Sequence, residues 1–266
     1  MQSSFVSFRN SNIHYTTTGT GEKILICLHG FAESAESFIS LAEHLTNKYT
    51  IVMPDMPLHG KTVWKEALAF TADELAQIIS AIPEVESRSF SVLGYSMGGR
   101  LALQLYQAIP HKIEKLILMA PDGIIINPWY RLATQTSAGN RLFYWAMKKP
   151  GGFFATTIAL KKLSLINTGV YKYVHQHLKT SDMRKRLYNI WTTMRKMKPD
   201  IQAVKKLIIT CKTPVILMYG RYDKVIRFTT GEKFMTGIEA FCTLKILDCG
   251  HRLLHEKNVA AIAAVL

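Results

Sequence analysis

Short apolar runs rich in β-branched residues alternate with helical patterns along most of this chain, and that alternation constrains its fold most strongly. Six runs are apolar on both faces, as expected for parallel strands that helices cover on both sides. These runs span residues 23–29, 49–53, 90–94, 115–120, 214–219 and 243–247. Between them lie helical patterns at 34–47, 71–82, 98–109, 229–240 and 252–265. The alternation predicts an α/β fold with a mostly parallel, doubly wound sheet and flanking helices.

The first twenty residues and the middle of the chain depart from this pattern. Two short apolar stretches flank the turn-prone residues 9–12, which predicts an antiparallel hairpin at the sheet edge. Between 123 and 206, aromatic and apolar residues recur at mixed helical spacings, which indicates several helices inserted between two strands. We therefore expect a core formed by 1–122 and 207–266, with a helical cap, or lid, at 123–206.

The net charge of +14 lies almost wholly in the inserted segment. Residues 123–200 hold fourteen Lys and Arg but only two acids, Asp182 and Asp200, whereas the rest of the chain is nearly neutral at +2. Such a basic segment suggests an anionic small-molecule substrate or a membrane surface as a partner. It carries no recognised nucleic-acid-binding motif, so we do not expect nucleic acid to bind.

Cysteine usage and apolar runs exclude several protein classes. The 4 cysteines are too few for a small disulfide scaffold, and no Cys-x-x-Cys pair or His/Cys cluster suggests a metal site. No apolar run approaches the roughly 20 residues of a membrane-spanning helix, and the first residues lack the apolar centre of a secretory signal. We expect a soluble, cytoplasmic protein without a metal or cofactor.

A G-x-S-x-G motif, Gly94-Tyr-Ser-Met-Gly98, joins the apolar run at 90–94 to a helical pattern. In a strand-turn-helix context this motif holds its serine in a strained conformation, with the hydroxyl exposed above the sheet. Glycines are required there because neighbouring backbone leaves no room for a Cβ. The context predicts that Ser96 is a nucleophile.

A serine hydroxyl needs a base and an orienting acid, and two later strands end in suitable residues. Asp223 follows the run at 214–219, and His251 follows the run at 243–247. Open α/β sheets bind ligands at the carboxyl ends of their strands, so these side chains can converge on Ser96. The chain order Ser, Asp, His is the order that accompanies this serine turn. We predict a Ser96-His251-Asp223 triad.

Acyl transfer through a serine also needs two hydrogen-bond donors for the developing oxyanion. The backbone N–H of Met97, directly after the nucleophile, is one expected donor. The other is the N–H of Phe31, in the loop that follows the run at 23–29. We expect the neighbouring His29 to brace that loop rather than to take part in catalysis.

Together these residues resemble the α/β-hydrolase family with a helical cap. The resemblance covers nearly all of the chain outside 123–206 and implies a serine hydrolase that cleaves a carboxylic ester or a related small acyl substrate. It rests on His29-Gly30-Phe31, Asp55-x-Pro-x-His-Gly60, Gly94-Tyr-Ser-Met-Gly-Gly99, Asp223 and His251. Leu58 is a departure, because the family usually has glycine there.

A weaker resemblance is to the menaquinone-pathway succinyl-cyclohexadiene-carboxylate synthase, an elimination enzyme of the same fold. Tyr95 and Arg100 stand where that enzyme has a tyrosine before its nucleophile and an arginine that grips a substrate carboxylate. The resemblance implies that both contact the substrate. In the other interpretation, Arg100 lies on the helix surface and has no such role. From the inserted segment, we expect Trp129 to contact the substrate.

Three functions therefore stay open: an ester hydrolase, a lyase or synthase that uses the triad as a base on an anionic substrate, and a non-enzymatic receptor or peripheral membrane protein. In the last, Lys148 and Lys149, beside the aromatic run 143–145 and near 153–154, contact an anionic bilayer. The contrasting interpretation puts these aromatic residues on the inner face of the cap and the lysines on its solvated face. The sequence leaves the oligomeric state open.

Overall fold

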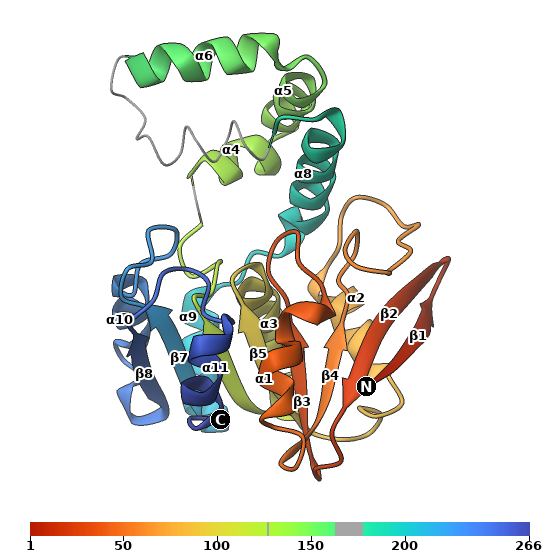
Figure 1. Cartoon of the computed structure of the whole chain (residues 1–266), viewed down its shortest axis with the longest axis vertical. Helices are drawn as coiled ribbons and strands as arrows, with labels where there is room; N and C mark the ends of the chain where they lie inside the picture. The colour runs from red at the N-terminus through yellow and green to blue at the C-terminus, as the bar shows by residue number, and fades with distance from the viewer. Residues whose placement is uncertain (127, 163–177) are drawn as a thin grey trace. The chain divides into compact units, whose positions relative to one another are not determined.

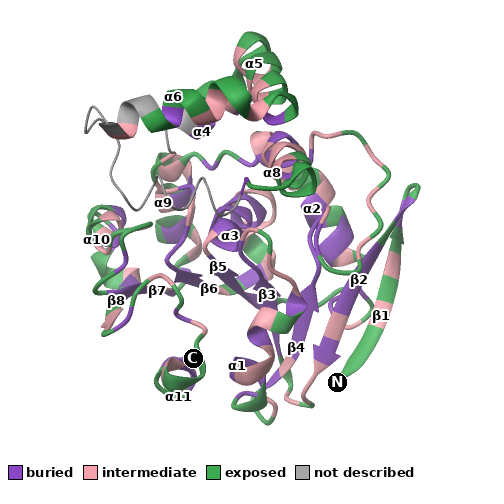
Figure 2. Cartoon of the chain, turned by 45° about the horizontal axis from the view of Figure 1, so that its top comes forward, coloured by how far each residue is buried: buried purple, intermediate pink, exposed green. Residues whose placement is uncertain are grey.

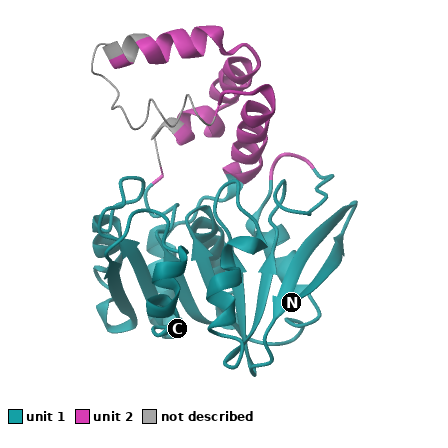
Figure 3. Ribbon diagram, viewed as in Figure 1, with its two compact units in different colours: residues 1–66, 70–125, 196–266 teal, residues 67–69, 126–195 magenta. Residues whose placement is uncertain are grey.

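The computed structural model describes residues 1–126, 128–162 and 178–266, apart from the side chains of 128, 129, 159, 160 and 162. These residues form two compact units, coloured separately in Figure 3. The sheet unit consists of residues 1–66, 70–125 and 196–266, and the helical unit consists of 67–69 and 126–195. Residues 196–206, which the sequence grouped with the inserted helices, belong to the sheet unit.

An eight-stranded sheet runs through the sheet unit in the order β1-β2-β4-β3-β5-β6-β7-β8 (Figure 1). β1 (Gln2–Phe8) and β2 (Ser11–Thr18) form the expected hairpin, and β2 is also antiparallel to β4. The six expected apolar runs form strands that are parallel to one another: β3 (Lys23–Leu28), β4 (Tyr49–Pro54), β5 (Phe90–Tyr95), β6 (Ile113–Met119), β7 (Val215–Gly220) and β8 (Cys242–Leu247). The predicted fold class is confirmed.

The central strands are buried on both faces, which explains why their sequences do not alternate between apolar and polar residues. Every residue of β5 is buried, and so are most residues of β3 and β6. Figure 2 shows this burial as purple strands in the middle of the sheet. Each fully buried Val, Leu or Ile stabilises the fold by about 1.5–3 kcal/mol relative to an exposed one. The sheet centre is therefore a rigid support for loops at the strand ends.

Helices cover both faces of the sheet (Figure 1). α1 (Ile39–Glu43) and α11 (Glu256–Ala263) contact each other on one face, whereas α2 (Ala72–Ser80), α3 (Met97–Ala108) and α9 (Ile201–Cys211) lie on the other. α10 (Thr229–Met235) packs against β7 and β8. The expected helices at 34–47, 229–240 and 252–265 are shorter than predicted, because 3-10 turns at Ala35–Phe38 and Glu239–Phe241 and a loop after His251 take up part of each pattern.

The helical unit contains α4 (Pro128–Gln135), α5 (Ser137–Lys148), α6 (Pro150–Lys162) and α8 (Ser181–Thr193). α5 packs against α8 through Phe143, whose ring centroid lies 5.4 Å from those of Tyr188 and Trp191. Tyr144 and Trp145 are exposed, so the run 143–145 does not form a single inner face. Within the described part of the chain, no helix combines the length and apolarity needed to cross a membrane.

A buried carboxylate ties the end of β4 to the N-terminal hairpin. Asp55 accepts hydrogen bonds from the backbone N–H of Ala35 (2.7 Å) and of Lys61 (2.9 Å), and it pairs with Nδ1 of buried His14 at 2.7 Å. Burial by itself raises the pKa of Asp55, but these hydrogen bonds outweigh it and hold the pKa below the usual range. The ionised carboxylate is therefore the form that stabilises this turn.

We predict that Asp55→Asn lowers the free energy of unfolding by about 3 kcal/mol at neutral pH. The reason is that His14 and the two backbone N–H groups lose the buried carboxylate that accepts from them. The lowered pKa means that the wild type gains this stability above about pH 3.9 and loses it as the pH falls through the folded-state pKa. Urea unfolding of both proteins between about pH 3 and pH 7 measures the difference. Exposed Asp73→Asn is the control, and an equal loss in that variant contradicts the prediction.

Candidate active site

Ser96 sits on the turn between β5 and α3 with φ +52° and ψ −116°, a conformation that non-glycine residues rarely adopt. Its backbone N–H donates to Met119 at 2.9 Å, and its carbonyl accepts from the N–H of Asp122 at 2.8 Å. A Cβ on Gly98 would lie 1.8 Å from the carbonyl oxygen of Leu28, so only glycine fits there. Close packing between the turn and two neighbouring strands thus holds Ser96 in its strained conformation.

The structure brings Ser96, His251 and Asp223 into one hydrogen-bonded series. Ser96 Oγ lies 3.1 Å from His251 Nε2, and His251 Nδ1 lies 2.7 Å from Asp223 Oδ2. The other carboxylate oxygen of Asp223 accepts from the N–H groups of Val225 (2.7 Å) and Ile226 (2.9 Å). The Asp223 side chain is fully buried, so it holds the proton on Nδ1 and leaves Nε2 as the acceptor that faces Ser96.

Tyr95 is buried, and its hydroxyl donates to the backbone carbonyl of His251 at 2.9 Å. Burial, and next the carboxylates of Glu33 and Asp223, raise the pKa of Tyr95. The residue therefore stays a neutral hydrogen-bond donor that fastens the loop carrying His251. The sequence predicted a substrate contact at this position, which stays a prediction, and in the structure the hydroxyl links the end of β5 to the loop that carries His251.

Arg100 is buried in α3, not on the helix surface as one interpretation held. Its Nη2 donates to Asp122 Oδ2, and a Cβ on Gly123 would lie 2.8 Å from the Arg100 Cγ. Asp122, directly beyond β6, was not identified from the sequence, because an acid after a strand has no distinctive spacing from an arginine 22 residues earlier.

Trp129 belongs to α4, and its side chain lies outside the described residues.

The two backbone N–H groups expected to bind the oxyanion belong to Met97 and Phe31. Met97 is the first residue of α3, where a helix has no intrahelical acceptor for its N–H. Phe31 lies in the loop after β3, and the described part of the chain offers no hydrogen-bond acceptor to its N–H. Ala32, the next residue, has φ +61°, which turns the chain sharply at this loop. The local backbone thus leaves both N–H groups without an acceptor in the described part of the chain.

His29 joins the loop after β3 to the loop after β4. Its ring is fully buried, its Nδ1 donates to the Gly30 carbonyl at 2.8 Å, and its Nε2 accepts from the N–H of Met56 at 3.0 Å. These two bonds require the neutral tautomer protonated on Nδ1. His59 is also buried, and its ring centroid lies 4.9 Å from that of His29. Neither histidine is hydrogen-bonded to Ser96.

Glu33 is a residue of the site that sequence reasoning missed. Its carboxylate accepts from the N–H of Gly30 at 3.2 Å, and a Cβ on Gly30 would lie 2.9 Å from Glu33 Oε2 and 3.5 Å from the Ser96 Cβ. Burial raises the pKa of Glu33, although the Gly30 hydrogen bond and then the nearby His251 and Arg252 oppose this effect. Its only signal in the sequence is a glutamate three residues after Gly30, a common arrangement in loops.

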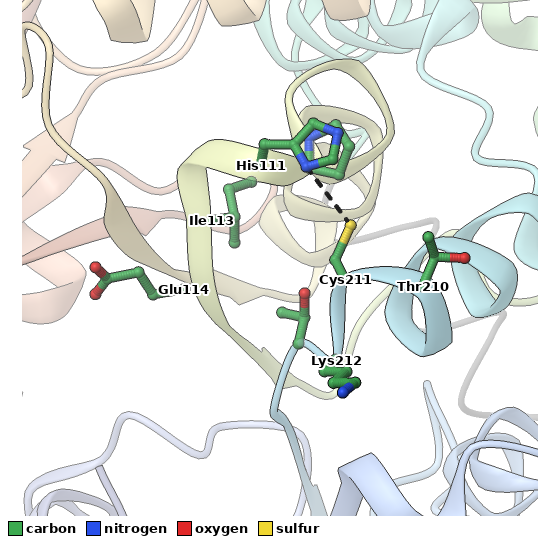
Figure 4. A pocket seen from close by; sticks show the side chains of 8 residues that line it. His111, Ile113, Glu114, Thr210, Cys211 and Lys212 are labelled. Carbon is green, nitrogen blue, oxygen red and sulfur yellow. Dashed lines mark hydrogen bonds between the residues drawn. The ribbon is translucent and has the colours of Figure 1, made fainter.

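A separate cavity of about 300 Å³ lies at the amino ends of β6 and β7, the opposite end of those strands from Ser96 (Figure 4). Cys211 Sγ lies 3.9 Å from His111 Nδ1 in it. Residues 110, 111, 113, 114 and 210–213 line this cavity. None of them belongs to the predicted triad. Among the described residues there is no group of three His, Cys, Asp or Glu side chains that would hold a metal ion.

We predict that Glu33→Gln changes how stability depends on pH. Because folding raises the Glu33 pKa, the wild type gains stability from the protonated form at low pH and loses it as the pH rises above about 4.3. The measured quantity is the free energy of unfolding of the wild type minus that of Glu33→Gln, obtained from urea titrations. This difference should decrease as the pH is raised from about 4 to about 7. Glu36→Gln, at an exposed position in the 3-10 turn that follows Glu33, is the control. A difference that rises with pH contradicts the prediction.

Comparison with known proteins identifies the family. The model of the alpha/beta hydrolase fold family matches residues 23–257. The chain is 21% identical over 252 residues to the uncharacterised hydrolase YugF of Bacillus subtilis, covering 92% of this chain and 90% of that protein. It is also 32% identical over 111 residues to the pimeloyl-[acyl-carrier protein] methyl ester esterase of Cronobacter sakazakii, covering 41% of this chain and only 40% of that relative.

Solved structures share the fold. A thermophilic esterase from Thermogutta terrifontis has a TM-score of 0.70 at 16% identity, covering 100% of this chain and 97% of that one. A thioesterase domain from the curacin biosynthetic pathway has a TM-score of 0.64 at 21% identity, covering 100% and 98%. With the family model matched across most of its length, the chain belongs to the alpha/beta hydrolase fold family, as its motifs predicted.

Proposed function

We propose that this protein is a serine hydrolase that cleaves a carboxylic ester or a related small acyl substrate. The observation that carries the proposal is the hydrogen-bonded series from Ser96 through His251 to the buried Asp223. Relatives named as methyl ester esterases, together with membership of the family, support ester chemistry rather than another reaction on this fold.

In the proposed mechanism, Ser96 Oγ attacks the carbonyl carbon of the substrate while His251 Nε2 accepts the hydroxyl proton. The tetrahedral intermediate collapses, the C–O bond to the leaving group breaks, and His251 returns the proton to the departing alcohol. A water molecule then attacks the acyl-enzyme with His251 again as the base, which releases the acid and restores Ser96. Asp223 keeps the imidazole in the required tautomer and stabilises its protonated form.

The negative charge of each tetrahedral intermediate falls on the former carbonyl oxygen. In the proposal, the N–H groups of Phe31 and Met97 donate to that oxygen, and their freedom from acceptors in the described residues supports this role. Removal of one such donor costs about 10²–10³ in rate in characterised serine hydrolases. Glu33 and His29 brace the loop that carries Phe31, so we assign both as positioning residues.

The ion pair between Arg100 and Asp122 favours ester hydrolysis over the lyase alternative. An arginine that grips a substrate carboxylate has to present its charge to the substrate, whereas Arg100 is buried and donates to Asp122. We therefore propose that Arg100 holds the segment after β6 against α3. Tyr95, whose hydroxyl donates to the His251 carbonyl, is proposed to position the histidine loop.

The triad leads to a direct test with a fluorophosphonate probe and a short p-nitrophenyl ester. Ser96→Ala should abolish labelling of the protein by the fluorophosphonate and lower kcat for the ester by at least about 10⁴-fold, because the nucleophile is lost. Asp223→Asn should also lower kcat by about 10⁴-fold, because an amide places the wrong tautomer on His251. Mass spectrometry of the labelled protein and initial rates measure both effects.

Asp248→Asn is the matched control, because this carboxylate follows a neighbouring strand, β8, but is exposed and pairs with Arg221. We expect its rates to stay within about twofold of the wild type, since exposed ion pairs contribute little. Full ester hydrolysis by Ser96→Ala would overturn the proposed mechanism.

A second prediction concerns Arg100. Arg100→Met should lower the free energy of unfolding by about 1–3 kcal/mol, because it leaves the half-buried Asp122 without its partner. The double variant Arg100→Met/Asp122→Asn should recover part of that loss. The ratio of kcat/KM for an ester with a carboxylate in its acyl group to that for a neutral ester should not change. A selective loss of the anionic substrate would instead favour the lyase-type role.

A further inference from the structure

One face of α5 combines exposed apolar side chains with cations. Leu142, Trp145 and Lys149 follow one another at spacings of three and four residues, and Arg141 and Lys148 lie four before and three after Trp145. These spacings place Arg141, Leu142, Trp145 and Lys148 on one side of the helix, and Lys149 follows as the C-cap residue with its ammonium over Trp145. Leu142 is 69% exposed and Trp145 is 57% exposed, whereas large apolar side chains are ordinarily buried. Figure 2 shows α5 mainly in the colours of exposed and intermediate residues.

The opposite side of α5 already has its packing partners. The Phe143 ring contacts α8 in tilted geometry, and Met147 is buried. Asn140 accepts from the Tyr188 hydroxyl at 3.0 Å and donates to Thr192 at 3.1 Å. The helix is thus held in place without Leu142 or Trp145. Their exposure is a property of a second apolar face, which we call the α5 face and define as Arg141, Leu142, Trp145, Lys148 and Lys149.

The charge around the α5 face is strongly positive. The helical unit has twelve Lys and Arg and one acid, Asp182, which lies in the first turn of α8. On the α5 face, Lys149 Nζ lies 4.9 Å from the centroid of the Trp145 ring. Lysine stems that lie along an aromatic side chain keep their ammonium groups at the border between apolar and polar surroundings. This is the arrangement that suits the interface of a bilayer with an anionic surface.

We propose that the α5 face docks on the surface of a bilayer that contains anionic phospholipids. Leu142 and Trp145 enter the boundary between headgroups and acyl chains, while Arg141, Lys148 and Lys149 pair with lipid phosphates. Charge alone would also attract nucleic acid, but a polyanion in water gives Leu142 no apolar surroundings. The combination of apolar and cationic side chains on one face therefore favours a lipid surface.

Docking on a bilayer would give the protein a location, and this inference does not depend on the chemistry proposed for Ser96. An enzyme held at a bilayer surface meets esters that partition into membranes at a higher local concentration than in bulk water. Docking needs only the helical unit, so binding and ester hydrolysis are measured separately. If the protein binds vesicles but does not hydrolyse esters, the proposed function is wrong and this inference holds. If it hydrolyses esters but does not bind vesicles, this inference is wrong and the proposed function holds.

Co-sedimentation of the full-length protein with vesicles tests the proposal. We expect binding to phosphatidylcholine vesicles that contain about 30% phosphatidylglycerol, and little binding to phosphatidylcholine alone. Raising the salt from about 0.1 M to about 1 M should weaken binding, because the Debye length falls from about 10 Å to about 3 Å. Lys148→Gln/Lys149→Gln should lower the partition coefficient by about 30-fold, since each cation near such a surface contributes roughly a factor of 5.

The decisive variant is Leu142→Ser/Trp145→Ser, which keeps every charge of the α5 face. Insertion of the two side chains predicts a loss of about tenfold or more for this variant. If this variant binds the vesicles as well as the wild type does, only the charges hold the protein on the vesicle, and the proposal is overturned. The matched control is Lys206→Gln/Ile209→Ser on α9, where a cation and an exposed apolar residue lie three positions apart in the sheet unit. An equal loss in the control would also overturn it, and circular dichroism verifies that each variant is folded.

Discussion

The close approach of the α3 N-terminus to the end of β3 is the contact on which the Ser96 site depends. A Cβ on Gly98 would lie 1.8 Å from the Leu28 carbonyl oxygen, so the helix can begin where it does only if this residue is glycine. The approach accompanies the positive φ of Ser96, +52°, and it brings Gly98 at the start of α3 against the backbone of Leu28 and His29.

Four carboxylates of the sheet unit each have a different partner. Asp55 is buried against His14 and backbone N–H groups, which keep it ionised, whereas burial raises the pKa of Glu33 despite its bond to Gly30. Asp122 is paired with Arg100, and Asp223 with His251. These partners distinguish Asp223, whose carboxylate lies against His251, from the other three carboxylates.

The basic residues of the chain have another distribution. They gather in the helical unit, where aromatic side chains divide between contacts inside the unit, such as Phe143 with Trp191, and exposed positions such as Trp145. The sheet unit is thus nearly neutral, whereas the helical unit is basic and exposes part of its apolar surface. Under the two proposals, the positive charge of the helical unit determines where the protein is located rather than which bond it cleaves.

The sequence by itself determined the fold class. It also predicted that Ser96, Asp223 and His251 lie together, because each follows an apolar run and the carboxyl ends of parallel strands meet at one edge of a sheet. Helix ends were less predictable, since turns at 35–38 and 239–241 depend on local packing. Only the tertiary structure showed the contacts that Glu33, Arg100 and Tyr95 make. The Tyr95 hydroxyl reaches a carbonyl 156 residues away, and Arg100 meets Asp122 beyond the next strand. Such contacts have no periodicity in the chain, because the packing of whole elements, and not the spacing of residues, brings the partners together.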